Sequence, residues 1–202
     1  VMKVLSAALC AVLAISARAC KKSNTPLPNV IAQATFRVDF DTTKGHIIVE
    51  VSRALAPIGV DRFYNLIQAK YFDGARFFRV VPGFVVQFGL AADPDTIWKW
   101  DQNIPDDPVL TSNRRGTITF AQTSQPNTRS TQLFINLGSN ERLDAQHFSP
   151  FGKVVEGMDN VDAIYSGDGD KPDQDSIKEK GNAYLEKEFP KLDYIYKARV
   201  LP

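Results

Sequence analysis

An apolar, strand-forming run that is interrupted by one turn, at residues 77–87, constrains this chain most. It reads Phe-Phe-Arg-Val-Val-Pro-Gly-Phe-Val-Val-Gln, so that Pro82 and Gly83 separate two short segments rich in Val and Phe. Only two of its side chains, those of Arg79 and Gln87, are polar. A guanidinium in such surroundings needs a partner or a cleft, and its five fixed donors suit a carbonyl target. The run therefore predicts a buried strand pair that carries a functional polar group.

Alternating apolar residues predict further strands around this pair. Phe36, Val38 and Phe40 alternate with polar residues, and a Gly-containing turn leads into a second alternating run at 46–51, which indicates a β-hairpin. Many short strands separated by turns are typical of a sandwich or a barrel. The remaining short strands are expected at 76–80, 84–88, 116–120, 132–136, 151–155 and 194–200.

Three helices are predicted between these strands. Pro57 suits the first turn of a helix whose apolar residues recur at three- and four-residue spacing, so this helix should cover one open end of the sheet. A second helix is expected at 158–165. Residues 175–189 predict a third helix that Pro190 ends. We interpret it as an added surface element before the last strand, since no motif there indicates a binding partner.

Length and charge restrict the function classes. The 202 residues suit one domain with a sizeable core. Lys and Arg number 24, Asp and Glu number 23, and the two signs are mixed along the chain. The sequence therefore shows no concentration of positive charge of the kind that indicates binding to nucleic acids or to anionic membrane surfaces. With His46 and His147 as the only histidines, imidazoles alone cannot form a zinc site, and we expect no metal or cofactor.

The N-terminal residues predict export. Lys3 precedes an apolar run at 4–15 and small residues around 17–19, which is the pattern of a secretory signal peptide over residues 1–19. The run is shorter than the roughly 20 apolar residues that a membrane-spanning helix requires. We therefore expect an exported, periplasmic protein.

Cys20 stands at the expected cleavage point. A lone cysteine there resembles the lipidated residue of bacterial lipoproteins, with 20–32 as a tether and 33–202 as the folded domain. Arg18 is unusual in such a site, and the alanines beside it also fit ordinary signal peptidase, so a soluble periplasmic or secreted protein is the alternative. Since the other cysteine, Cys10, lies within the signal, no disulfide is expected inside the domain.

Three segments in a fixed order give the chain a resemblance to a known family. They are the run at 77–87, Gln-Leu-Phe-Ile-Asn at 132–136, and Leu-Asp-Ala-Gln-His-Phe at 143–148 ahead of Phe-Gly-Lys-Val at 151–154. In this order they resemble the cyclophilin family of peptidyl-prolyl cis/trans isomerases, from about residue 34 to residue 200. The resemblance implies a mainly β fold, a closed eight-stranded antiparallel barrel capped by two α-helices. It also implies isomerisation of X-Pro bonds in unfolded or exported proteins, without a nucleophile, metal or cofactor.

The resemblance also implies which residues form the site. Arg79 matches the family's catalytic arginine, which donates hydrogen bonds to the prolyl residue and favours the twisted amide. Taken alone, Arg79 would as readily belong to a structural ion pair. Apolar residues wall the proline pocket, and 121–123 lies along the residue before proline. The substrate-binding residues implied in this way are Phe84, Val85, Gln87, Ala121, Gln122, Thr123, Gln132, Phe134, Leu143 and His147.

Three positions depart from the family pattern. Phe78 stands where eukaryotic members often have histidine. Arg142 stands where many have the tryptophan that binds cyclosporin, so weak cyclosporin binding is expected. Residues 95–109, with Trp98 and Trp100, replace a glycine-rich loop, and we expect the tryptophans to fold this loop on itself rather than to hold substrate.

Two other function classes are compatible with the same fold. A non-catalytic peptide-binding chaperone or scaffold would use the same groove, but the presence of both Arg79 and Gln87 weighs against it. A carrier of a small ligand would need an open barrel, whereas Phe36, Phe40 and Phe77 are expected to fill the interior.

Overall fold

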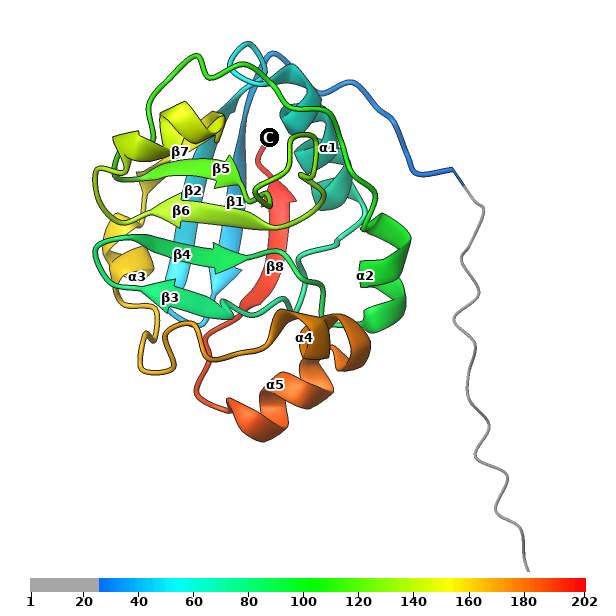
Figure 1. Ribbon diagram of the computed structural model, residues 1–202, viewed down its shortest axis with the longest axis vertical. Helices are drawn as coiled ribbons and strands as arrows, with labels where there is room; N and C mark the ends of the chain where they lie inside the picture. Colours follow the sequence, from blue (N-terminus) through cyan, green and yellow to red (C-terminus); the bar gives the residue numbers. More distant parts are fainter. Residues whose placement is uncertain (1–25) are drawn as a thin grey trace, which may run out of the picture.

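An antiparallel sheet of eight strands curls into a barrel in the computed structural model, which describes residues 26–202 (Figure 1). The predicted signal peptide and Cys20 lie outside the described residues. The predicted strands are confirmed to within three residues at their ends. They are β1 (Thr35–Thr42), β2 (Gly45–Ser52), β3 (Arg79–Val81), β4 (Val85–Phe88), β5 (Thr117–Phe120), β6 (Leu133–Asn136), β7 (Pro150–Glu156) and β8 (Ile195–Val200).

The strands are hydrogen-bonded in the order β3-β4-β6-β5-β7-β2-β1-β8, so β3 and β8 are the outermost. The barrel is completed by the segment that leads into β3. Arg76 forms an isolated bridge with Tyr194, and the Gly74 amide donates to the Ile195 carbonyl at 2.8 Å. Figure 1 shows β3 to β6 crossing in front of β1, β2 and β8.

Aromatic rings fill the barrel, as expected. Helix α1 (Pro57–Gln68) begins at Pro57 and places Phe63 in the interior, where its ring lies 6.2 Å from that of Phe40. Phe40 also contacts Phe88, at 5.6 Å between ring centres. Phe36, Phe40 and Phe77 are all buried. The interior is therefore a packed core and not an open ligand-binding lumen.

The prediction of a loop at 95–109 was wrong in its first half. Residues Pro94–Trp100 form helix α2, which Asp93 caps by accepting a hydrogen bond from the Thr96 amide. The expected inward packing holds for Trp100, which is 3% exposed, whereas Trp98 is 45% exposed. The expectation of a loop came from the resemblance, because family members have a glycine-rich loop at this position.

The single helix predicted at 175–189 is divided in two. Helices α4 (Gln174–Lys180) and α5 (Asn182–Glu188) meet at Gly181, which has a φ of 57°. A Cβ at Gly181 would also collide with the Ala92 carbonyl oxygen. The chain therefore turns here and packs α4 against α2, as Figure 1 shows below β3 and β4.

Two shorter helices and the N-terminal segment complete the fold. Helix α3 (Met158–Asp162) ends three residues earlier than predicted, and Glu141–Gln146 forms a 3₁₀-helix, η1. The Ala32 amide donates to the Asp61 carboxylate of α1, so the last residues of the predicted tether lie against that helix. From residue 26 onward, no helix is both long and apolar enough to cross a membrane.

Candidate active site

The hairpin of β3 and β4 places the two polar residues of the 77–87 run side by side. Arg79 and Gln87 are directly opposite in the antiparallel register, so their side chains emerge on the same face. Val86 and Phe88, which flank Gln87 in β4, point into the core and are buried. Gly83 makes the connecting turn possible with a φ of 73°. Strand alternation thus directs the guanidinium to the outer face of the barrel.

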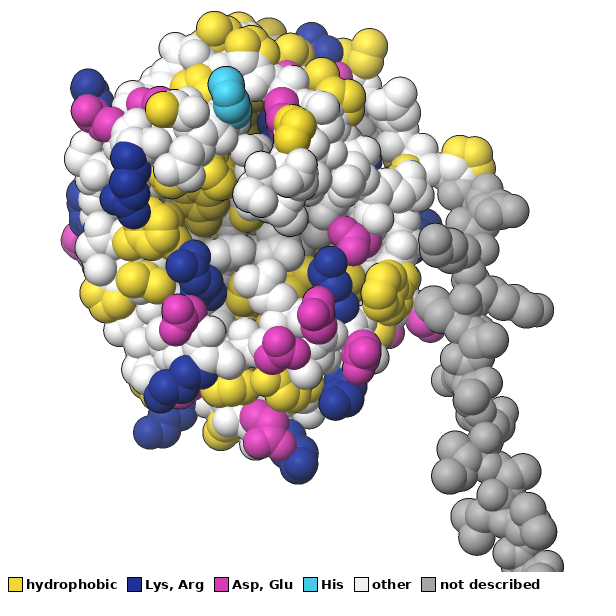
Figure 2. All heavy atoms as spheres, viewed as in Figure 1, with side chains coloured by type: hydrophobic (Ala, Val, Ile, Leu, Met, Phe, Trp, Pro, Cys, Tyr) yellow, Lys and Arg dark blue, Asp and Glu magenta, His cyan; other side chains and the backbone are white. Residues whose placement is uncertain are grey.

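A small apolar cluster lies next to Arg79 on this face, separate from the main core. Its buried members are Val85 of β4, Phe134 of β6 and Leu143 of η1, and Phe84, Ala121 and Phe148 pack against them. The Phe134 and Phe148 rings meet edge to face at 5.7 Å. Figure 2 shows a hollow lined with hydrophobic side chains on this side of the molecule. The hollow offers an apolar surface against which a pyrrolidine ring can be buried.

Leu143 is held in place by its neighbour Asp144. The Asp144 carboxylate accepts hydrogen bonds from the Asn113 amide at 2.9 Å, from the Asn113 side chain at 2.8 Å, and from the Ser112 hydroxyl. Burial opposes ionisation of Asp144, but these hydrogen bonds outweigh it and lower the pKa of the carboxyl. Asn113 also donates to the Phe148 carbonyl at 2.8 Å, so one buried side chain fixes both walls of the hollow.

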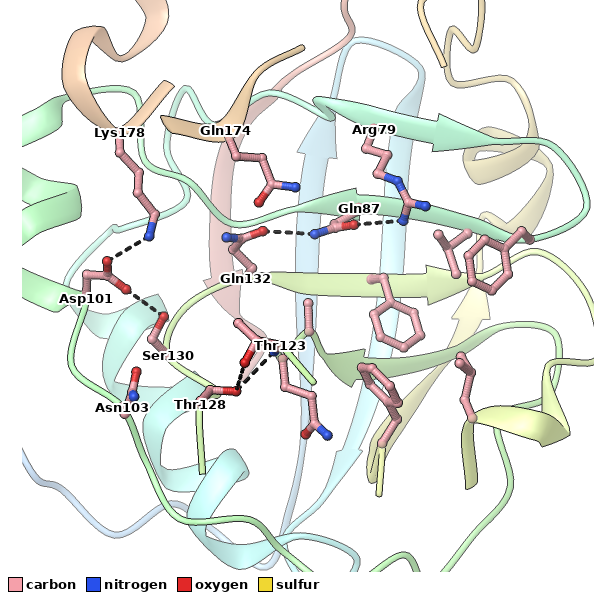
Figure 3. A pocket seen from close by; sticks show the side chains of 17 residues that line it. Arg79, Gln87, Asp101, Asn103, Thr123, Thr128, Ser130, Gln132, Gln174 and Lys178 are labelled. Atoms are coloured by element: carbon pink, nitrogen blue, oxygen red, sulfur yellow. Dashed lines mark hydrogen bonds and ion pairs between the residues drawn. The ribbon is translucent and has the colours of Figure 1, made fainter. Parts of the chain in front are cut away.

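A directed chain of hydrogen bonds runs along the floor of the site (Figure 3). Arg79 Nη1 donates to Gln87 Oε1 at 3.1 Å, and Gln87 Nε2 donates to Gln132 Oε1 at 2.8 Å. No carboxylate among residues 26–202 lies within 4.0 Å of the Arg79 guanidinium. Arg79 therefore does not form the structural ion pair, among the described residues, that the sequence left as an alternative. Arg79 keeps most of its donors for a ligand.

The hollow and this chain of hydrogen bonds open into one cavity of about 500 Å³. Arg79 and nine of the ten predicted substrate-binding residues line it; those nine are Phe84, Val85, Gln87, Ala121, Gln122, Thr123, Gln132, Phe134 and Leu143. The tenth, His147, does not line the cavity. It is exposed and takes a left-handed backbone conformation, φ 64°, where η1 ends. The structure thus gathers residues from 79 to 143 in one place but leaves His147 at the surface.

The edge of the cavity at 121–123 is fixed by local contacts. The Ala121 amide donates to the Gln132 carbonyl at 2.9 Å, and Gln122 Nε2 donates to the Gln146 carbonyl at 3.0 Å. The Thr123 amide donates to the Thr128 hydroxyl at 3.0 Å. Gln132 therefore supports this edge with its backbone, whereas its side chain belongs to the hydrogen-bond chain from Arg79.

Seven further residues line the cavity that sequence reasoning missed: Asp101, Asn103, Thr128, Ser130, Phe148, Gln174 and Lys178. Phe148 was within reach of the sequence, because it ends the same family-like segment, residues 143–148, that begins with Leu143. The others follow the end of α2, lie in the loop before β6, or belong to α4. The packing of α4 against α2 brings Gln174 and Lys178 to the cavity, and no spacing in the sequence signals it.

Arg142 covers one edge of the hollow. Its guanidinium lies 4.7 Å from the centre of the Phe84 ring, on which Arg79 also lies at 5.7 Å. Phe84 is thus contacted by two cations. Among residues 26–202 no cluster of three or more His, Cys, Asp or Glu side chains could hold a metal ion.

Comparisons with known proteins agree on one family. The profile of the cyclophilin-type peptidyl-prolyl cis-trans isomerases matches residues 37–182. The chain is 31% identical to a peptidyl-prolyl cis-trans isomerase of Acinetobacter baylyi in an alignment 147 positions long that covers 66% of this chain and 73% of that protein. It is 32% identical to peptidyl-prolyl cis-trans isomerase A of Dickeya dadantii in an alignment 148 positions long that covers 68% of this chain and 75% of that protein.

Solved structures support the same fold. A crystal structure of a cyclophilin-type peptidyl-prolyl cis-trans isomerase of Cryptosporidium parvum superposes with a TM-score of 0.64 at 21% identity, covering 83% of this chain and 98% of that one. The same isomerase, crystallised in the presence of the dipeptide Ala-Pro, gives a TM-score of 0.63 at 21% identity, covering 82% of this chain and 99% of that one.

Proposed function

This chain belongs to the cyclophilin-type peptidyl-prolyl cis-trans isomerase family, and from that membership and the cavity at Arg79 we propose that it accelerates the rotation of X-Pro peptide bonds. One observation carries the proposal. A guanidinium without a carboxylate partner among the described residues lies beside an apolar hollow, and both line one cavity. Neither a structural ion pair nor an ordinary core explains that combination.

The geometry suits the chemistry of rotation. The planar amide resists twisting by about 18–20 kcal/mol because of conjugation between nitrogen and carbonyl. The hollow of Val85, Phe134 and Leu143 holds the proline ring in place, so that the X-Pro bond rotates relative to a fixed ring. Arg79 donates to the prolyl residue when conjugation is lost, and Gln87 orients the guanidinium by accepting from Nη1. No covalent step is needed.

The test is the isomerisation of a proline-containing tetrapeptide by the purified protein. We expect the wild type to accelerate it, Arg79→Ala to lose about 10²-fold in kcat/KM, or ~2.7 kcal/mol, and Gln87→Ala to lose about tenfold. Arg115→Ala is the matched control, because Arg115 is exposed and pairs with Asp162 away from the cavity. Failure of the folded wild type to accelerate the reaction would leave peptide binding without catalysis as the function.

We also propose that the protein is exported and that Cys20 is lipidated, so that it acts on exported proteins from a membrane tether in the periplasm. The support is the sequence alone: Lys3, the apolar run at 4–15 and the position of Cys20. Mass spectrometry of the protein from a membrane fraction tests this. We expect a diacylglyceryl modification on Cys20 that Cys20→Ser removes, whereas cleavage after 19 with a free thiol would favour the soluble alternative.

We further propose that cyclosporin binds weakly. Arg142 occupies the place at which cyclosporin-binding members have an indole, and its cation lies over Phe84 at the rim of the hollow. Covering a charged guanidinium with an apolar cyclic peptide costs free energy, because the charge loses water without gaining a partner. Arg142→Trp should tighten inhibition by about tenfold, as measured by the inhibitor concentration that halves activity. An unchanged or weaker inhibition would contradict the role given to Arg142.

A further inference from the structure

The cavity has a second end, polar rather than apolar, to which α4 contributes. We define this polar end by Asp101, Ser130, Gln132, Gln174 and Lys178, which all line the cavity. Lys178 Nζ lies 3.0 Å from Asp101 Oδ2, and the Ser130 hydroxyl donates to Asp101 Oδ1 at 2.8 Å. Figure 3 shows Lys178 reaching from α4 toward Asp101, and Gln174 from the same helix lying near Gln132. Helix α4, expected to be a surface addition, is therefore a wall of the site.

The direction of the hydrogen-bond chain fixes what the polar end presents. A guanidinium can only donate, so the oxygen of Gln87 faces Arg79 and its amide nitrogen faces the oxygen of Gln132. The amide nitrogen of Gln132 is left over, and it has no acceptor among residues 26–202. This nitrogen carries two donors at the border of the polar end. Lys178 keeps further donors beyond the one directed at Asp101.

The net charge of the cavity lining, like its free donors, favours a ligand that accepts hydrogen bonds. The charged side chains that line the cavity are Arg79, Lys178 and Asp101, so the lining carries one net positive charge. The carboxylate of Asp101 is already engaged by Lys178 and Ser130. Lys178 and Asp101 are 26% and 22% exposed, so water reaches the pair from the cavity and screens it only in part. An incoming group that accepts hydrogen bonds and carries negative charge meets donors on both sides.

We propose that the polar end selects substrates with an acidic side chain, such as glutamate, at one of the two residues before the proline. This inference rests on the proposed function, since it assumes that the apolar hollow takes the proline. The hollow and Lys178 line the same cavity of about 500 Å³, and a chain rises at most about 3.6 Å per residue, so we assign the acidic side chain to a residue near the proline. The side before proline follows from the expectation that 121–123 runs along the residue before it. Gln132 and Lys178 are the specificity-determining residues.

The experiment compares peptides with Glu, Gln, Lys or Ala at each of these two positions. Both kcat/KM and the dissociation constant are measured, the latter by fluorescence anisotropy, so the preference is tested even where turnover is slow. We expect Glu to be favoured over Lys by about threefold to tenfold at one position, with the preference declining as salt is raised. Equal values for Glu and Lys at both positions would overturn the proposal.

Variants assign the preference to α4. Lys178→Met keeps the apolar stem and should bring the ratio of Glu to Ala peptides near one, whereas Lys178→Glu should invert the order of Glu and Lys. Lys180→Met is the matched control, because Lys180 lies on the same helix but does not line the cavity. An unchanged ratio in Lys178→Met would overturn the role of Lys178. Absent turnover of the Ala peptide by the wild type would instead reject the proposed function, with the binding ratios still testing the polar end.

Discussion

The two ends of the cavity are built from different kinds of structure. At the apolar end, β4 and β6 pair in register, and backbone hydrogen bonds place Val85 and Phe134 next to Arg79. At the polar end, side chains from three separate segments meet around Asp101, where Ser130 and Lys178 are held by side-chain bonds. In a pair of strands, the hydrogen-bond register fixes the position of every residue. The positions at the polar end depend instead on how a few buried groups pack the surrounding loops.

Arg129 is the group that holds those loops. It is 1% exposed, donates from Nη1 to Asp107 Oδ2 at 3.1 Å, and also donates to the Pro105 carbonyl. Asp107 in turn accepts from the Ile58 and Gly59 amides at the start of α1. The backbone of Arg129 pairs with Ile104, and its neighbour Ser130 reaches Asp101. One buried ion pair thus ties the polar end to a helix of the core.

The largest expected effect breaks this support. Arg129→Leu leaves the Asp107 carboxylate buried without its cation, so we expect a loss of about 3–5 kcal/mol in the free energy of unfolding, measured with urea. Arg115→Leu removes an exposed pair with Asp162 and should cost less than about 1 kcal/mol. Hydrogen exchange in Arg129→Leu should rise first at 101–109 and 121–131. An equal rise in β4 and β6 would show that the two ends are not independent.

The same contrast explains what the sequence could predict. Alternation in the 77–87 run and in 132–136 was enough to place Arg79, Gln87 and Phe134 on one face, because a strand has a fixed period of two residues. Asp101 and Lys178 are 77 residues apart and meet through the packing of α4 on α2. Nothing local distinguishes Lys178 from the exposed Lys180 two residues later.

The predicted boundaries of helices were wrong where a single residue determines where the helix ends. The break at Gly181 depends on its contact with Ala92, a residue far along the chain. Likewise, His147 belongs to the motif that the sequence matched, yet the end of η1 leaves its side chain exposed. A motif predicts which segments meet, but the last turn of each segment decides whether a given side chain faces the cavity.

The next effect sharpens the apolar side of the comparison. Phe134 and Phe120 lie on adjacent strands, but Phe134 lines the cavity and Phe120 lies in the main core. Phe134→Leu and Phe120→Leu should each cost about 1–1.5 kcal/mol of stability, since both shorten a buried apolar side chain. Only Phe134→Leu should raise KM for a proline peptide, by about tenfold or ~1.4 kcal/mol, because it loosens the hollow. Similar KM values in the two variants would mean that proline does not occupy this hollow.

The smallest effect concerns Asp144, whose side-chain hydrogen bonds support the apolar end as side-chain bonds support the polar end. Hydrogen bonds from Ser112 and Asn113 lower the pKa of Asp144 below its unfolded value, despite the opposing effect of burial. A carboxyl with a depressed pKa stabilises the folded state at pH values above its unfolded pKa of about 3.9. This contribution is lost as the pH falls through the lower, folded pKa.

Asp144→Asn keeps the shape and one acceptor oxygen, so at neutral pH we expect it to lose about 1 kcal/mol in the free energy of unfolding. The wild type should keep this advantage down to about pH 4 and lose it below, because protonation then makes its side chain as neutral as the amide. Urea titrations of both proteins from pH 7 to pH 3 measure the difference. Because Asp144 holds η1 and with it Leu143, KM should rise over the same acidic range in the wild type. A difference in stability that stays constant to pH 3 would mean that packing, and not the charge on Asp144, fixes this wall of the hollow.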